Sequence, residues 1–115
     1  IIYVTINRLN YLFTGDISKE VESDLYQTYH HLDVDVLKVA HHGSSSSSSE
    51  DLFKMIDPKV ALISVGKNNR YRHPSYLTLK RLEAYGVKIY RSDFQGMVKI
   101  VYYGGKNYVM TSSGF

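Results

Sequence analysis

Two short segments place side chains that can bind a metal or move a proton directly after apolar runs. Residues 11–13 lead into Asp16, and residues 34–40 lead into two adjacent histidines, His41 and His42. An aspartate and histidines at the ends of neighbouring strands can be brought together at one edge of a sheet, and both are ligands that divalent metals accept. The pattern therefore points to a hydrolase rather than to a generic globular domain.

Each of these residues also has a simpler interpretation. Asp16 could form an Asx turn or cap the helix that follows it. Adjacent side chains of an extended segment point to opposite faces, so at most one of His41 and His42 readily addresses a given site unless the chain has already turned. His30 and His31 end an expected helix, where histidine is favourable for the helix dipole, and we expect no catalytic role for them.

A third candidate histidine, His73, ends a polar loop that carries three cations within six residues. The cations are Lys67, Arg70 and Arg72, which are suited to phosphate oxygens. Pro74 limits the conformations open to the histidine before it. The alternative is a solvated connection that caps the next helix. In its functional interpretation the loop predicts contact with a phosphate-bearing substrate.

Several other chemistries have no support in the sequence. Six consecutive serines, residues 44–49, are not part of a Gly-x-Ser-x-Gly motif, so a serine nucleophile is not expected. Nucleotide-binding glycine motifs are absent. Because the chain has no cysteine, a metal would be held by His, Asp or Glu. The net charge of +3 allows a polyanionic substrate without requiring one, and the eleven tyrosines could stack on bases but more commonly pack strands.

The elements that must position these residues alternate between strand and helix. Spacing and capping residues predict helices over 18–31, over 50–56, and from Ser75 to Gly86, whereas the serine run predicts a flexible loop. The alternation predicts a single α/β domain over residues 1–115, and hairpins at both ends predict a mixed β-sheet with flanking helices. Strands are expected at residues 1–6, 11–13, 34–40, 60–65, 87–90, 97–103 and 108–111.

Taken together, these motifs resemble the metallo-β-lactamase fold, and more narrowly the C-terminal domain of the ComEC-type DNA-internalisation competence family. The resemblance spans about residues 9–103. Residues 64–71 followed by His73-Pro74 are its most specific part. The segments that carry it are residues 12–17, 32–44, 58–71 and 73–74.

The resemblance implies roles for individual residues. Asp16 matches a metal-ligand aspartate that can bridge two ions. His41 and His42 together match the family's late histidine motif, in which either could be the ligand; His41 is the favoured ligand, with His42 as its catalytic neighbour. His73 matches a catalytic histidine that contacts phosphate or donates a proton. The implied cofactor is a divalent metal, Zn or Mn, as one or two ions. The residues implied at the phosphate- or DNA-binding rim are Lys67, Asn68, Asn69, Arg70, Arg72 and Ser44.

The chain departs from the family pattern in one large respect. The His-x-His-x-Asp-His type of cluster that leads the family's metal site has no counterpart here. The chain is therefore expected to be the C-terminal half of an αββα sandwich, a partial domain of a longer protein. By itself this half is expected to lack activity, to hold metal weakly or not at all, and to be open to self-association through exposed apolar surface.

The function implied by the resemblance is hydrolysis of phosphodiester bonds in the strand that is not transported during DNA uptake. The implied partners are single-stranded DNA and the membrane-channel part of the parent protein. The implied location is a soluble domain on the extracellular face of the bacterial plasma membrane. Two alternatives stay open: a same-fold hydrolase of a small ester or thioester, which the basic loop disfavours, and a non-catalytic module that binds DNA or docks on the channel.

Overall fold

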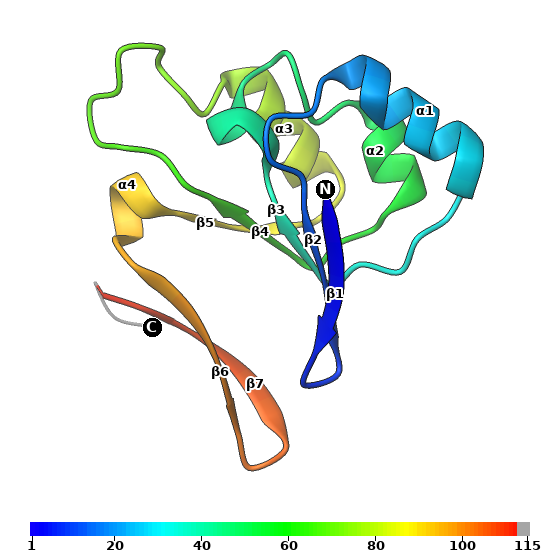
Figure 1. The fold of residues 1–115 in the computed structure, drawn as a ribbon. Helices are drawn as coiled ribbons and strands as arrows, with labels where there is room; N and C mark the ends of the chain where they lie inside the picture. The colour runs from blue at the N-terminus through cyan, green and yellow to red at the C-terminus, as the bar shows by residue number, and fades with distance from the viewer. Residues whose placement is uncertain (113–115) are drawn as a thin grey trace.

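The computed structural model describes residues 1–112, and its main feature is a five-stranded sheet with helices on one face (Figure 1). In this sheet the first two strands pair antiparallel. Each later pair is parallel, because the helical connection between the two strands brings the chain back to the edge at which the previous strand began. The expected mixed α/β sheet is thus confirmed. In their order across the sheet the strands are β1 (Ile2–Ile6), β2 (Leu9–Phe13), β3 (Val36–Lys38), β4 (Val60–Ile63) and β5 (Lys88–Arg91).

The three main helices begin where the sequence predicts. Ser18, Ser49 and Ser75 each accept the backbone N–H of the residue three positions on, which satisfies one free donor of the first turn. No helix within residues 1–112 combines the length and the apolar character needed to cross a bilayer. The helices are α1 (Lys19–Tyr29), α2 (Glu50–Met55), α3 (Tyr76–Ala84) and the short α4 (Ser92–Gln95).

Several expected boundaries were wrong. Helix α1 ends at Tyr29, before the expected end at residue 31, because His30 takes a positive φ of 54°. The strand expected over residues 34–40 is limited to the three residues of β3, and a 3-10 turn, η1 (Ala40–Gly43), follows it. The first turn is also shorter than expected, since positive φ angles at Asn7 and Arg8 already reverse the chain. The sequence analysis missed α4 altogether.

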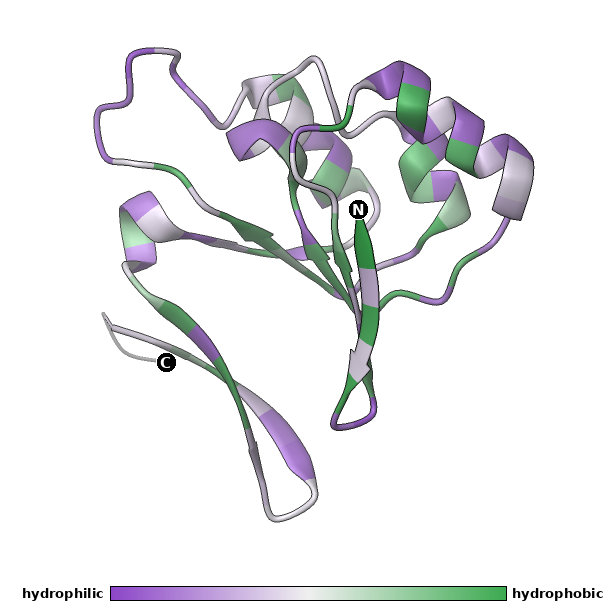
Figure 2. Cartoon of the chain, in the orientation of Figure 1, coloured by the Kyte–Doolittle hydropathy of each residue, from purple (hydrophilic) through white to green (hydrophobic). Residues whose placement is uncertain are grey.

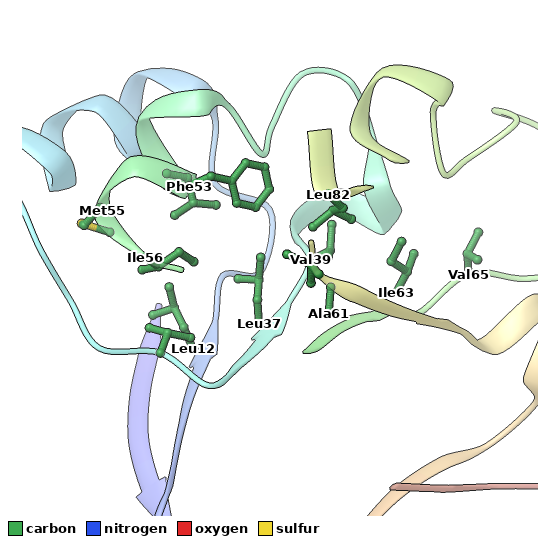
Figure 3. Close-up of a cluster of buried hydrophobic side chains, with 13 residues drawn as sticks. Leu12, Leu37, Val39, Phe53, Met55, Ile56, Ala61, Ile63, Val65 and Leu82 are labelled. Atoms are coloured by element: carbon green, nitrogen blue, oxygen red, sulfur yellow. The ribbon is translucent and has the colours of Figure 1, made fainter. Parts of the chain in front are cut away.

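The core lies between the sheet and the helices that cover one of its faces (Figure 3). Leu12, Leu37 and Ala61 occupy one row of the parallel register, so their side chains face the same side of the sheet. All three are 2% exposed or less, as is Phe53 of α2 above them. Burying a side chain such as leucine contributes about 2 kcal/mol, which keeps the ends of β2, β3 and β4 in fixed register.

The last two strands do not join the main sheet. β6 (Val98–Tyr103) and β7 (Lys106–Thr111) form a separate two-stranded antiparallel sheet on the side away from the helices (Figure 1). Val36 and Val60 belong to the register row that faces away from the core, and they share a small cavity with Ile100 and Val109 of the hairpin. The hairpin therefore shields part of the face of the main sheet that points away from the helices.

The outer edge of β1 exposes large apolar side chains. Ile2 is 62% exposed and Ile6 is 48% exposed, and within residues 1–112 no strand pairs with β1 on its outer side. Edge strands of this kind are sites of association with other chains. The self-association expected from the sequence stays a prediction.

The serine segment, residues 44–49, is not the flexible loop that its composition predicts. Ser47 and Ser48 are 1% and 0% exposed. The carboxylate of Glu22, also 0% exposed, accepts the backbone N–H groups of Ser48 and Ser49 at 2.7 Å each. One buried carboxylate thus fastens α1 to the segment and satisfies free donors where α2 begins.

Replacing Glu22 by glutamine should lower the free energy of unfolding by about 1–2 kcal/mol. The side-chain NH₂ would present a donor to a backbone donor and leave a buried N–H without a partner. Glu20→Gln, an exposed position in the same helix, is the matched control and should change stability by less than about 0.5 kcal/mol. Urea denaturation of both variants measures the difference, and equal stabilities would contradict the fastening role.

Candidate functional site

Asp16 and the tandem histidines follow β2 and β3 at the same edge of the sheet. Parallel strands end at one edge, so the segments after β2 and β3 are neighbours. The backbone N–H of His41 donates to the carbonyl of Gly15 at 2.9 Å, and the hydroxyl of Thr14 donates to the carbonyl of Lys38 at 2.6 Å. These two bonds tie the aspartate turn directly to the histidine turn.

The chain turns before the tandem histidines, so they do not alternate as strand residues would. His41 and His42 have positive φ angles of 52° and 54°. Nδ1 of His41 lies 3.3 Å from the hydroxyl of Ser46, and Nδ1 of His42 lies 2.7 Å from the carbonyl oxygen of Ser64. A carbonyl can only accept, so Nδ1 of His42 carries the proton, and Nε2 of the neutral ring is left as an acceptor or a ligand.

His73 lies beside the histidine turn. Its ring centroid is 6.0 Å from that of His41. Asn69 holds its backbone from both sides: the Asn69 side chain donates to the carbonyl of His73 and accepts its N–H, at 2.7 Å each. The N–H of Ser75 donates to the carbonyl of Gly43 at 2.9 Å, which docks the start of α3 against the histidine turn. The amide of Asn69 is therefore used to orient His73 within the loop.

The basic loop between β4 and α3 is strongly hydrophilic (Figure 2). The loop also borders a cavity of about 270 Å³. His42, His73, Arg70 and Tyr71 are among the residues that line it. The remaining rim residues expected from the sequence divide by exposure: Lys67, Asn68 and Arg72 are exposed, whereas Ser44 is 8% exposed and shares a hydrogen bond of 2.9 Å with Ser46.

Two cationic groups at the edge have lowered pKa values. Partial burial lowers the pKa of His73, and the neighbouring His41 and His42 lower it further. Burial also lowers the pKa of Lys38, which Asp16 partly offsets. The charge of Lys38 near Asp16 was not expected from the sequence, although a lysine within an apolar strand-like run was an available signal.

The lowered pKa of His73 predicts a loss of stability in mild acid. The unfolded chain binds a proton near the ordinary pKa of 6.5, whereas the folded chain resists protonation until lower pH. The folded state is therefore penalised as pH falls below that value and unaffected above it. The drop in melting temperature between about pH 7.5 and pH 5.5 should be smaller in His73→Gln than in the wild type and in the exposed control His31→Gln. An identical drop in all three would contradict the prediction.

The residues at this edge do not make a complete metal site. Among residues 1–112, no three His, Asp or Glu side chains lie close enough together to hold one ion. Zinc sites in proteins use three or four protein ligands. Asp16 and His41 share an edge, and these two residues are fewer than the ligands that such a site requires.

The fold and this edge define an α/β domain in which a carboxylate, imidazoles and a basic loop meet at the carboxyl ends of parallel strands. No family model matches the chain. The chain is 36% identical over 113 residues to ComE operon protein 3 of Bacillus subtilis (strain 168). The matched region covers 98% of this chain and 14% of that protein.

Two further relatives match most of this chain. The chain is 36% identical over 89 residues to Competence protein ComA of Neisseria gonorrhoeae, covering 76% of this chain and 13% of that protein. It is 33% identical over 103 residues to Recombination protein 2 of Haemophilus influenzae, covering 90% of this chain and 13% of that protein. The chain thus spans a small part of each relative, and these similarities support the competence and DNA-uptake family that its motifs resemble.

Proposed function

We propose that this chain is part of a DNA-uptake protein and that its sheet edge binds DNA and contributes to phosphodiester hydrolysis of the strand that is not transported. The observation that carries the proposal is the meeting of Asp16, three histidines and the basic loop at one edge, in a chain similar to competence proteins. In the proposal the domain is attached to the membrane-embedded part of the longer protein, on its extracellular face.

Different groups among the described residues are suited to binding DNA and to transferring protons. Lys67, Arg70 and Arg72 are exposed cations that can contact successive phosphates. His42 and His73 line the adjoining cavity, where a neutral imidazole can accept a proton or, once protonated, donate one to a leaving oxygen. This arrangement suits cleavage of a bond next to a bound phosphate.

In this proposal Asp16 and His41 are part of a ligand set for a divalent metal, Zn or Mn, and the remaining ligands come from the longer protein. A divalent ion held there would supply Lewis-acid chemistry at the phosphate. Because residues 1–112 do not complete the set, the 115-residue chain alone is expected to be inactive.

The incomplete ligand set favours a second candidate, a non-catalytic DNA-binding or channel-docking module. Elemental analysis and a nuclease assay on both the 115-residue chain and the longer protein separate the two. Manganese- or zinc-dependent cleavage by the longer protein supports hydrolysis. DNA binding by both without cleavage or bound metal by either supports the binding module.

Replacing Lys67, Arg70 and Arg72 together by glutamine should weaken DNA binding and flatten its salt dependence. Loss of three phosphate contacts to a single strand reduces the slope of log K against log salt by about 2. Three exposed lysines far from the loop in sequence, Lys54, Lys99 and Lys106, give a control with the same change in net charge. Titrations at several salt concentrations measure the slopes of the loop variant and of the control. Equal slopes would contradict a contact between the loop and DNA.

A further inference from the structure

Tyr71 stands out among the residues of the basic loop because its ring is open to solvent and already stacked on one side. The side chain is 74% exposed. The centroid of its ring lies 5.9 Å from that of His73, and the two ring planes are inclined by 23°, so the rings are stacked. It also lines the cavity that His42 and Arg70 border. A largely exposed ring, stacked on a histidine, is therefore flanked in the sequence by two arginines, Arg70 and Arg72.

The loop holds this ring in a defined place. Asn68 and Arg72 have positive φ angles of 54° and 55°, so the chain reverses on both sides of the segment. Within it, the side chain of Asn69 bonds to the carbonyl of Gly66 at 3.2 Å as well as to both backbone groups of His73. The ring is presented by a braced turn, which lowers the entropy lost when a ligand binds it.

The chemistry of this arrangement selects a flat ring carrying a phosphate. Aromatic side chains bind unpaired nucleobases by stacking, and nearby cations hold the backbone phosphates. In a duplex each base is already stacked between its neighbours, so its face is not available to a protein ring. The juxtaposition of a free aromatic face with cations fits a single strand better than a duplex.

We propose that Tyr71, backed by His73, is a stacking platform for an unpaired nucleobase, so that this edge prefers single-stranded to duplex DNA. The inference rests on the proposed function and adds to it the residue that gives this edge its preference for a single strand. The phosphates lie on Lys67, Arg70 and Arg72, and one base lies on the open face of Tyr71.

Two other exposed tyrosines differ from Tyr71 in their surroundings, and one of them, Tyr103, is the matched control. Tyr103 is 77% exposed at the end of β6, in the separate hairpin. Tyr76 is 71% exposed, but its ring already carries the ammonium of Lys80 at 5.4 Å from the centroid. Exposure alone is therefore common in this chain, whereas an exposed ring stacked on a histidine of the candidate site is found in the described residues at Tyr71.

The test measures binding of a fluorescent oligothymidylate and of a duplex of equal length to the longer protein, as wild type, Tyr71→Ala, Tyr71→Phe and Tyr103→Ala. Loss of one stacked base weakens binding by about tenfold. We expect that loss for Tyr71→Ala with the single strand alone, near wild-type binding for Tyr71→Phe, and no change for Tyr103→Ala. The preference for the single strand should shrink by the same factor.

Two results would overturn the inference while leaving the proposed function intact: wild-type binding of the single strand by Tyr71→Ala, or an equal loss for single strand and duplex. The second result would mean that the tyrosine only supports the loop. Failure of the wild type to bind either DNA would instead refute the proposed function, and the stacking platform with it. Circular dichroism of each variant confirms that the fold is retained.

Discussion

Replacing Asp16 by alanine in the longer protein should abolish the divalent-metal-dependent cleavage of DNA that we propose for it. We expect a loss of more than about 100-fold, because changes to residues that merely support metal ligands already cost 10–100-fold. The carboxylate is exposed at the sheet edge, and the turn that carries it is bonded to the backbone of His41 at 2.9 Å. Cleavage of a labelled single strand in the presence of manganese measures the effect, and elemental analysis reports the bound metal.

The same substitution should leave the fold intact, which separates a ligand from a structural residue. Asp16 is exposed, so its removal should change the free energy of unfolding by less than about 0.5 kcal/mol. Asp57→Ala, at another exposed aspartate, is the control and should keep full activity. Wild-type cleavage by Asp16→Ala with unchanged metal content would refute the assignment of Asp16 as a ligand.

The position of Asp16 shows why part of this site could be predicted from the sequence. The alternation of apolar runs and helical spacing implies parallel strands, and parallel strands end at one edge. That reasoning brings Asp16, His41 and His42 together without any coordinates, and the structure places their segments in hydrogen-bonded contact. Local patterns were sufficient here because the strand ends are fixed by the topology of the sheet.

Other features depend on contacts between distant segments, and no local pattern reports them. The serine segment is ordered because Glu22, more than twenty residues earlier, accepts two of its N–H groups. The orientation of the tandem histidines depends on positive φ angles, which the sequence leaves open for histidine. The serine composition wrongly predicted a flexible loop, because the number of polar side chains does not show which groups bind the backbone of the segment.

The strands of the β6–β7 hairpin were predicted from the sequence, but the separate sheet that they form was not. Both strands were expected from their own residues, but their pairing with the main sheet was not determined by them. Instead, Ile100 and Val109 turn toward the far face of that sheet. Strand patterns specify which residues share a face, and they leave open which sheet a strand joins.

Gly43→Ala should be the most destabilising of the single substitutions considered for this edge. Gly43 has a φ of 83°, and a Cβ built on it would lie 2.5 Å from the Cβ and 3.0 Å from the Cα of Pro74. The backbone conformation and the overlap each cost about 1–2 kcal/mol, which gives a loss of about 3 kcal/mol in unfolding free energy. Gly66→Ala is the control, because its Cβ would meet no atom within 4 Å.

The glycine also links the fold to the site, so its replacement should disturb DNA binding in molecules that remain folded. The carbonyl of Gly43 accepts the N–H of Ser75, and His42 and His73 precede the two residues that would collide. Moving Pro74 away shifts His73 relative to His42 and distorts the cavity between them. Urea denaturation and DNA titrations of both variants test these expectations together. A Gly43→Ala protein as stable as Gly66→Ala would contradict the close packing of the histidine turn on Pro74.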